Sequence, residues 1–444
     1  MNPDRFLNHT LRAHPHGDAV ARILAAAIDS VEPGSVVAES LSVDGNHLTI
    51  SGKKVELTGR VSALGIGKAA AAMTGSLAEI LGKRLTMGLV VTKRIPESID
   101  PRLEVILGGH PLPDQRSLSA GHRIEEFVRQ LKPEDLLICL ISGGGSALVS
   151  LPKVGVSLQD LQKLTTSLLE SGARIDEINI LRRQLDRLKG GGLARMVQPA
   201  QVVSLILSDV VGNPLETIAS GSTVPNPTTS KDAIAVLKRY GLVDKCPPNI
   251  MESLQQSEKQ TSQSESFEHV QNFIVGSNLI AAQSALKQAA QEGFHPYLLR
   301  TDLQGEAREA ARDLAIQLRW AWKMGDPAPR PACIIAGGET TVIVRGDGRG
   351  GRNTELALAS VSELADFPDV MLVTLATDGE DGDTDAAGAV VTGDSWRRGI
   401  SKDMNSCEFL GRNDSYSYFA TLDELLKPGS TGTNVNDLTF LFTF

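Results

Sequence analysis

The stretch DLLICLISGGGSAL, residues 135–148, joins an apolar run to a glycine-rich loop. An uninterrupted apolar run of this length predicts a β-strand that is buried on both faces. The loop that follows it offers backbone N–H groups from Ser142, Gly143, Gly144, Gly145 and Ser146, and the two serines add hydroxyls. Such a loop suits a phosphate or another anion. It lacks the spacing of a Walker A loop, and a plain tight turn is the alternative interpretation.

On both sides of this stretch, apolar runs alternate with segments of helical length. Further strands are expected at 61–66, 87–91, 103–107 and 202–208. Helices are expected to begin near Lys68, Ser117 and Ser157. This alternation predicts the α/β class, with a mainly parallel sheet that is covered by helices on both faces.

The segment 252–268, ESLQQSEKQTSQSESFE, has almost no apolar residues and predicts a linker or an exposed loop. We expect residues 1–251 to form an N-terminal domain and residues 269–444 to form a C-terminal mixed α/β domain. The first helix, at 17–31, has an apolar face that could pack on the C-terminal domain.

Two strand pairings are expected in the C-terminal domain. CIIAGG (333–338) is expected to pair with TTVIVRG (340–346) across a Gly-Gly turn, and NDLTFLFTF (436–444) to form a terminal hairpin. Helices are expected at 279–292, 305–323 and 353–365.

Charge and composition exclude several classes of function. The net charge is −9, with no basic stretch, so nucleic acid is not expected as a partner. No apolar run reaches the roughly 18 residues of a membrane span, and the charged N-terminus does not resemble a secretory signal. We therefore expect a cytoplasmic protein, with no membrane partner. The four cysteines form no metal-ligand pattern. The oligomeric state stays open, a homodimer included.

A second glycine loop, ALGIGKAAAAM (63–73), allows two interpretations. Gly65, Gly67 and Ala70 match the dinucleotide fingerprint G-x-G-x-x-A, which would fit an NAD(P)H-dependent reductase. The acidic residue expected after the next strand is missing, and that strand ends instead in Thr92-Lys93-Arg94. Lys68 stands where a helix begins, a position that disfavours a cation unless an anion is bound. We interpret Lys68 as a phosphate ligand, with a solvated lysine as the alternative.

Three further loops carry candidate site residues. Asp209 follows a strand directly and could hold Mg²⁺ on a nucleotide, or could simply cap a turn. Arg349 and Arg352 lie among four glycines before a predicted helix, and their guanidinium groups match a carboxylate or a phosphate. The acidic loop 376–389 offers Asp378 for a metal or a hydroxyl, with Asp-Gly turns as the alternative.

Together these segments resemble the glycerate kinase family that carries a C-terminal MOFRL domain. The matching segments span nearly the whole chain in order: GIGKAA, GGHPLPD, SGGGSAL, INILRRQLDRLKGGGLA, the Asp209 loop, GGET, GGRN with TELALA, TDGEDG with TDAAGA, and TGTNVNDL. The resemblance implies an N-terminal Rossmann-like three-layer domain, a MOFRL-type C-terminal domain and an active site in the cleft between them. It also implies ATP and Mg²⁺ as donor and cofactor, and conversion of D-glycerate to 2-phosphoglycerate.

The resemblance also implies roles for individual residues. Lys68 and Arg352 match the functional lysine and arginine of the family, and His110, in GGHPLPD, is assigned to the substrate. We assign the γ-phosphate to Lys68 and the SGGGS loop, and Mg²⁺ to Asp209. Arg352, with Arg349, would hold the glycerate carboxylate or the transferring phosphoryl group. Asp209 and Asp378 are both candidates for the base. Four positions depart from the family pattern: Gln184, Ser222, Thr354 and Asp383.

The reductase remains the alternative function, since family members have also been labelled hydroxypyruvate reductases. Lys68 and Arg352 both lie at loop or helix-start positions, and replacing either is expected to leave folding almost untouched.

Overall fold

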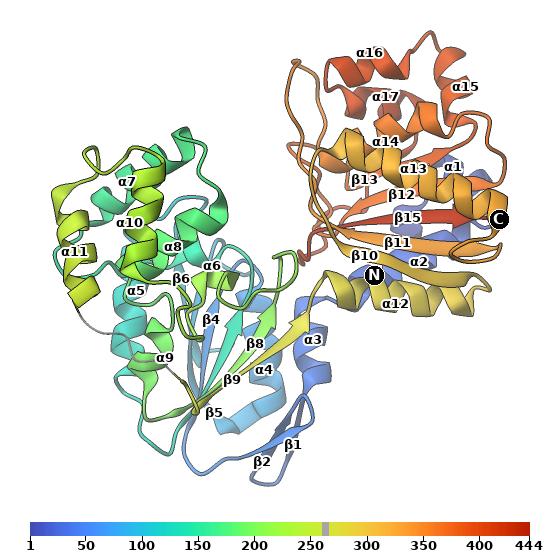
Figure 1. Cartoon of the computed structure of the whole chain (residues 1–444). Helices are drawn as coiled ribbons and strands as arrows, with labels where there is room; N and C mark the ends of the chain where they lie inside the picture. Colours follow the sequence, from blue (N-terminus) through green and yellow to red (C-terminus); the bar gives the residue numbers. More distant parts are fainter. Residues whose placement is uncertain (260–265) are drawn as a thin grey trace. The chain divides into compact units, whose positions relative to one another are not determined.

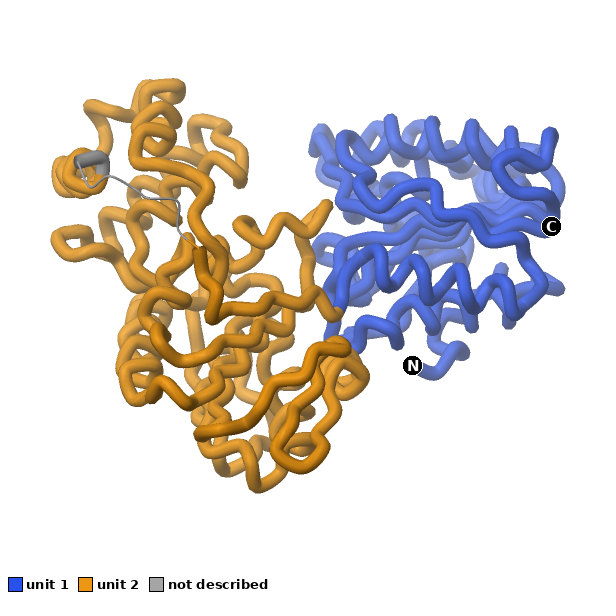
Figure 2. Tube along the Cα trace, turned by 60° about the horizontal axis from the view of Figure 1, so that its bottom comes forward, with its two compact units in different colours: residues 1–32, 276–444 blue, residues 33–275 orange. Residues whose placement is uncertain are grey.

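The computed structural model describes residues 1–259 and 266–444, and the chain divides into two compact units (Figures 1 and 2). Unit 1 contains residues 1–32 and 276–444, and unit 2 contains residues 33–275. The predicted linker 252–268 lies partly outside the described residues, which omit 260–265. The stretch before the gap belongs to helix α11 (Pro248–Lys259). After the gap, β9 (Val270–Gly276) joins the sheet of unit 2.

The sheet of unit 2 has six strands in the order β6-β5-β4-β7-β8-β9. The first four pairs in this order are parallel. The strands other than β9 are β4 (Val61–Ile66), β5 (Leu85–Thr92), β6 (Leu103–Leu107), β7 (Leu136–Ile141) and β8 (Gln201–Leu207). All residues of β4 and β7 are buried. The parallel sheet predicted from the apolar runs is therefore confirmed.

Helices cover both faces of this sheet, which gives three layers (Figure 1). Leu64 and Ile66 of β4 lie in one apolar cluster with residues of α5 (Gln115–Val128) and α9 (Gly192–Val197). A Cβ on Gly65, which faces the other way, would contact Thr74 and Ala70 of α4 (Ala70–Leu81). Strand alternation thus directs α4 to the opposite face from α5 and α9.

The remaining elements of unit 2 extend this core. A separate apolar cluster joins four helices: α7 (Leu158–Glu170), α8 (Ile175–Leu185), α10 (Ser230–Arg239) and α11. A three-stranded antiparallel sheet contains β1 (Leu41–Asp44), β2 (His47–Ile50) and β3 (Lys53–Glu56). Short helices complete the unit: α3 (Pro33–Ser40), η2 (Gly82–Arg84), α6 (Gly145–Leu148) and η3 (Ile218–Ser220).

Unit 1 contains a mixed sheet in the order β10-β11-β15-β12-β13-β14. Its strands are β10 (His295–Leu303), β11 (Ala332–Gly338), β12 (Val370–Ala376), β13 (Gly388–Thr392), β14 (Leu425–Leu426) and β15 (Asp437–Thr443). β10 and β11 are parallel, and the other pairs are antiparallel.

Both pairings predicted for this unit were wrong. TTVIVRG is not a strand, and β11 pairs with β10 and β15 instead. The C-terminal run forms no hairpin, because β15 inserts between β11 and β12. Every residue of β15 is buried there, a position that suits its apolar side chains better than an edge hairpin would.

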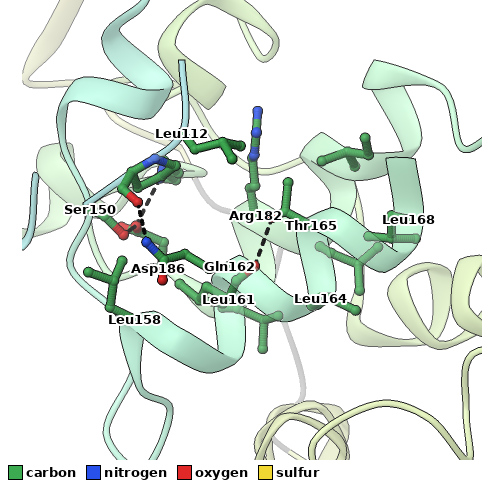
Figure 3. Close-up of a pocket in the computed structure, with 15 residues that line it drawn as sticks. Leu112, Ser150, Leu158, Leu161, Gln162, Leu164, Thr165, Leu168, Arg182 and Asp186 are labelled. Atoms are coloured by element: carbon green, nitrogen blue, oxygen red, sulfur yellow. Dashed lines mark hydrogen bonds and ion pairs between the residues drawn. The ribbon is translucent and has the colours of Figure 1, made fainter. Parts of the chain in front are cut away.

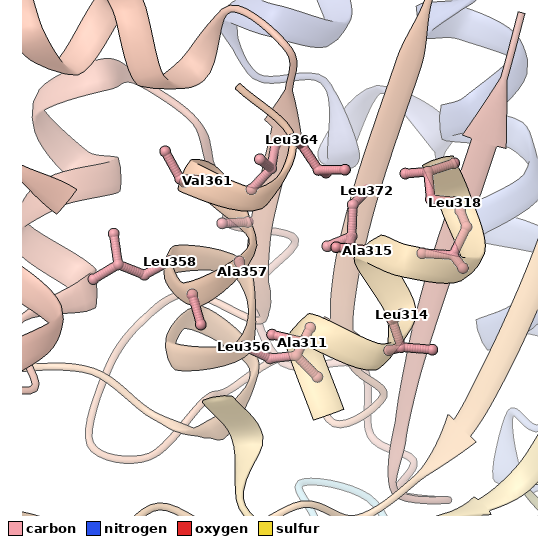
Figure 4. Close-up of a cluster of buried hydrophobic side chains, with 14 of the residues drawn as sticks. Ala311, Leu314, Ala315, Leu318, Leu356, Ala357, Leu358, Val361, Leu364 and Leu372 are labelled. Carbon is pink, nitrogen blue, oxygen red and sulfur yellow. The ribbon is translucent and has the colours of Figure 1, made fainter. Parts of the chain in front are cut away.

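Helices also cover both faces of the unit 1 sheet. Figure 4 shows Leu372 of β12 between apolar side chains of α13 (Ala307–Met324) and α14 (Arg352–Glu363), which belong to the same buried cluster. α12 (Asn278–Gln291) packs on β10 and β11 and against the N-terminal α2 (Gly17–Asp29). The apolar face of α2 is therefore buried within unit 1.

The smaller helical elements of unit 1 lie near its N-terminus and between β13 and β14. They are η1 (Pro3–Phe6), α1 (His9–Ala13), α15 (Ser395–Ile400), α16 (Ser406–Gly411) and α17 (Ser415–Leu422). In the part of the chain that the structure describes, no helix is both long and apolar enough to cross a membrane.

Candidate active site

The loops that follow β4 and β7 are hydrogen-bonded to each other at the carboxyl edge of the unit 2 sheet. The N–H of Ser142 donates to the Ile66 carbonyl (2.9 Å), and the N–H of Lys68 donates to the Gly143 carbonyl (2.9 Å). The Ser142 hydroxyl accepts from the N–H of Ala69 at 3.0 Å. The two glycine loops that stood out in the sequence therefore form one structural element.

Three predicted side chains lie against the glycines of this element. A Cβ on Gly144, which has a φ of +82°, would lie 3.2 Å from His110 Cδ2 and 3.3 Å from Lys68 Cε. A Cβ on Gly143 would lie 2.0 Å from Asp209 Oδ2. Any larger residue at 143 would collide with the carboxylate unless the Asp209 side chain moved away. The structure thus brings Lys68, His110 and Asp209 together around the SGGGS loop.

The charged groups of this site favour an anion. Lys68 is exposed and forms no ion pair within residues 1–259 and 266–444. Burial raises the pKa of Asp209, and the positive charge of Lys68 opposes this shift. Burial lowers the pKa of His110, and so do the charges of Lys68 and Lys93. His110 is therefore favoured in its neutral form, and the lysine charge is available to a ligand.

Two serines link the SGGGS loop to the long loop after β8. The hydroxyls of Ser146 and Ser220 are 2.6 Å apart. Ala219 and Ser220 adopt left-handed backbone conformations, with φ of 48° and 56°, which are costly for residues other than glycine. A different glycine loop, residues 190–192, supports this turn, because the N–H of Gly190 donates to the Ser220 carbonyl (2.9 Å). Sequence reasoning missed Ser220, because nothing in its type marks a strained turn.

In unit 1, Arg352 is the first residue of α14 and contacts two carboxylates. Its Nε donates to Asp437 Oδ2 (2.5 Å), its Nη2 donates to Asp437 Oδ1 (3.2 Å), and its Nη1 lies 3.0 Å from Glu339 Oε1. Burial lowers the pKa of Arg352, but the hydrogen bond to Asp437 and the negative charges of Asp437 and Glu339 outweigh this effect. The pKa of Arg352 is therefore raised above its ordinary value. Asp437 and Glu339 were not singled out from the sequence, although both lie in the quoted motifs TGTNVNDL and GGET.

The acidic loop holds the start of α14 in place. Asp381 accepts hydrogen bonds from the N–H groups of Asn353 (3.0 Å) and Thr354 (2.8 Å) and from the Thr354 hydroxyl (2.8 Å). Asp381 thus caps the helix whose first residue is Arg352. Burial raises the pKa of Asp378, and the charge of Asp437 raises it further while that of Arg352 lowers it. Asp378 is therefore within electrostatic reach of the Arg352 cluster.

Arg349 has a different environment from Arg352. Its guanidinium carbon lies 4.2 Å from the centre of the Tyr416 ring. Tyr416 in turn donates to Asp385 and accepts from Lys427, 2.6 and 2.8 Å away. None of these groups contacts Arg352, so the structure does not bring the two predicted arginines together by a shared partner.

Three of the four departures from the family pattern have structural partners. Gln184 donates to the Thr228 carbonyl (2.7 Å), Ser222 donates to the Ala219 carbonyl (3.1 Å), and Thr354 bonds to Asp381 as described. Asp383 is exposed, and nothing in the structure explains its identity.

The described residues contain no group of three or more His, Cys, Asp or Glu side chains placed to hold a metal ion. A magnesium ion carried by a nucleotide needs only one or two protein carboxylates beside the phosphates. Asp209 could meet that requirement, because its carboxylate lies against Gly143 of the SGGGS loop.

Known proteins match this chain over most of its length. A family model described as a domain of unknown function, DUF4147, matches residues 19–255, and the MOFRL family model matches residues 332–437. Glycerate 2-kinase of Pyrococcus horikoshii is 36% identical over 94% of this chain and 95% of its own length. D-glycerate 2-kinase of Thermotoga maritima is 39% identical, with the same coverage.

Solved structures agree with these relatives. The crystal structure of a P. horikoshii protein has a TM-score of 0.88 and 35% identity, covering 97% of this chain and 99% of that one. The crystal structure of the T. maritima glycerate kinase has a TM-score of 0.87 and 37% identity, covering 96% and 99%.

Proposed function

The chain belongs to the glycerate kinase family, and from that premise we propose that it transfers the γ-phosphoryl group of Mg-ATP to D-glycerate, giving 2-phosphoglycerate. The observation that carries the proposal is the SGGGS loop with Lys68 beside it, a lysine without an ion pair among the described residues. The relatives named above are kinases, so the comparisons do not favour the NAD(P)H-dependent hydroxypyruvate reductase.

The glycine loop supports phosphate binding through its backbone. In the described chain, the N–H groups of Gly143 and Gly144 donate to no backbone carbonyl, and they stand at the start of α6. Phosphoryl transfer requires mainly positioning and neutralisation of charge. We assign these N–H groups and the Lys68 ammonium to the phosphates of the nucleotide, with the Ser142 hydroxyl fixing the loop.

Asp209 is our candidate ligand for the magnesium ion. The ion would neutralise negative charge on the phosphates of the nucleotide. The carboxylate of Asp209 is held against Gly143, which limits the directions from which it can bind. Its pKa, raised by burial, would fall again beside a cation, because a positive charge favours the ionised carboxylate.

In unit 1 we assign Arg352 to the carboxylate of glycerate or to the transferring phosphoryl group. Of the five N–H donors of a guanidinium, three face Asp437 and Glu339, which leaves two for a substrate. The proton of the reacting hydroxyl needs an acceptor. Asp209 and Asp378, each with a raised pKa, remain the two candidates.

The test is incubation of the purified protein with ATP, Mg²⁺ and D-glycerate, followed by phosphorus NMR. We expect ADP and 2-phosphoglycerate, with the 3-isomer as the distinguishable alternative product. Excess EDTA should abolish the reaction and Mg²⁺ should restore it. Oxidation of NADH or NADPH with hydroxypyruvate, without phosphoryl transfer, would refute the kinase proposal.

A further inference from the structure

Arg182, on α8, is a half-buried cation whose positive charge is poorly balanced by the groups around it. Its Nη1 donates to Asn179 Oδ1 at 3.3 Å, a long hydrogen bond. No ion pair of Arg182 with a carboxylate occurs in the ranges the structure describes. Burial lowers the pKa of Arg182, and only the more distant charge of Asp186 opposes that shift. A guanidinium in this setting gains more than an exposed one from binding an anion.

The carboxylate whose charge acts on Arg182, that of Asp186, already has other partners. Asp186 is buried, and its Oδ2 accepts from the Lys189 ammonium (2.9 Å), the Ser150 hydroxyl (3.0 Å) and the N–H of Leu151 (3.0 Å). Its Oδ1 accepts from the N–H of Leu188 at 2.9 Å. Asp186 is therefore bonded to Lys189 and to three uncharged donors, and it does not pair with Arg182. One positive charge, that of Arg182, remains for a ligand.

A chain of hydrogen bonds connects Arg182 to the phosphate loop. Asn179 Oδ1, which accepts from Arg182, also accepts from the Ser220 hydroxyl at 3.3 Å. Ser220 in turn contacts Ser146 of the SGGGS loop. Asn179 and Ser220 are both buried, so the positions of these groups are well defined. Each link is within hydrogen-bonding distance, and Arg182 therefore lies near the loop assigned to phosphates.

A cavity lies beside Arg182 (Figure 3). Its apolar side comes from residues of α7 such as Leu161 and Leu164, and Leu112 from the His110 loop lies opposite. The side chain of Arg182 extends toward Leu112 and away from Leu161. The cavity volume is about 30 Å³, room for roughly two water molecules, so it could hold the end of an oxyanion group but not a nucleoside.

We propose that Arg182 is a substrate-binding residue whose guanidinium binds an oxyanion head group beside the SGGGS loop. The oxyanion is the carboxylate of the acceptor or a phosphate of the nucleotide, two sources of the same chemistry. The proposal rests on the proposed function for the identity of these substrates. Arg182 thereby adds a cation that the glycine motifs alone do not supply.

Steady-state kinetics of Arg182→Gln and Arg182→Lys test this role. The matched control is Arg187→Gln, because Arg187 lies in the same segment but pairs with Glu125. For Arg182→Gln we expect the KM of one substrate to rise by roughly 10- to 100-fold, the range for a lost hydrogen bond to a charged group. A rise for D-glycerate identifies the carboxylate, and a rise for Mg-ATP identifies the phosphate. Arg182→Lys should recover part of the loss, and Arg187→Gln should leave both KM values unchanged.

Thermal unfolding separates binding from a structural role. Arg182→Gln should melt no lower than the wild type without ligands, because it removes an uncompensated charge, and should lose stabilisation by D-glycerate or by ADP. A lower melting temperature with both KM values unchanged, or a folded variant with wild-type KM values, would overturn the proposal. If the wild type phosphorylates no glycerate, the proposed function fails, and the ligand-induced stabilisation alone decides the role of Arg182.

Discussion

Lys68 in unit 2 and Arg352 in unit 1 are cations held in opposite ways. Lys68 is exposed beside a glycine loop, and the described part of the chain offers it no ion pair. Arg352 is 32% exposed and shares its guanidinium between Asp437 and Glu339. The first arrangement leaves the positive charge of Lys68 available to a ligand. The second fixes the orientation of the Arg352 guanidinium, while the two carboxylates balance its positive charge.

This difference separates two ways of preparing a site for an anionic substrate. An unpaired cation attracts an anion strongly but is free to move. A guanidinium that is fixed by two carboxylates attracts an anion less strongly. Its remaining N–H groups point in set directions, however, so it holds a bound anion in a better defined orientation. We infer that Lys68 acts mainly through charge and Arg352 mainly through orientation. The predictions below test that distinction.

The largest effect is expected for Arg352→Ala, which should lose activity and stability together. Removing a preorganised donor should lower kcat by on the order of 10²–10³. It also removes the ion-pair partner of the Asp437 carboxylate, at a cost of about 1.5–3 kcal/mol in the stability of unit 1. The expectation that folding would be untouched is thus revised for Arg352. Initial rates and thermal unfolding measure the two losses.

Two variants serve as controls for Arg352, one that keeps the positive charge and one that removes an equally exposed arginine elsewhere. Arg352→Lys should remain impaired, because an ammonium cannot reproduce the bidentate contact with Asp437. Arg319→Ala removes an arginine of similar exposure, 31%, that pairs with Glu363 away from the candidate site residues. It should lose stability without losing kcat. Near wild-type kcat in folded Arg352→Ala would contradict the assignment of Arg352.

Lys68→Ala should lose activity alone. We expect kcat to fall by on the order of 10²–10³, with no drop in the melting temperature, since Lys68 has no ion pair to break within residues 1–259 and 266–444. Lys83→Ala, an exposed lysine of η2, is the matched control and should leave kcat unchanged. A melting temperature that falls as far as that of Arg352→Ala would remove the contrast between the two cations.

Asp437→Asn should have a smaller effect on catalysis. The amide oxygen can still accept one hydrogen bond from Arg352, but the charge is lost. A weakened charge-assisted hydrogen bond of about 1.5 kcal/mol corresponds to roughly a tenfold fall in kcat. If Arg352 acted by charge alone, freeing it from Asp437 would raise activity instead. Steady-state kinetics distinguish the two outcomes by their sign.

The smallest effect concerns Asp209 and pH. Because the pKa of Asp209 in the folded protein is raised above 3.8, burial of its charge costs stability once the pH exceeds 3.8. The cost grows with pH until the folded pKa is passed and is then constant. Asp209→Asn should therefore melt higher than the unliganded wild type at neutral pH, with a gain that shrinks as the pH falls. A gain independent of pH would contradict this account.

Much of the fold was predictable because the relevant signals are local. The apolar runs of β4, β7 and β8 and the glycines after them lie within short windows, and parallel strands necessarily bring their carboxyl ends to one edge. The grouping of Lys68, Asp209 and the SGGGS loop follows from that rule. The pairing of residues 340–346 failed, since alternation alone does not say which strand a segment joins.

The sequence by itself determined the α/β class, the glycine loops and the identities of Lys68, Asp209 and Arg352 as candidates, because residue type and spacing limit local backbone and chemistry. Only the tertiary structure decided which groups each charged side chain contacts. The partner of Arg352 is Asp437, far along the chain, and is brought to it by the insertion of β15 between β11 and β12. The isolation of Arg182 is likewise a property of its surroundings, since a saturated Asp186 cannot be recognised from the residue type.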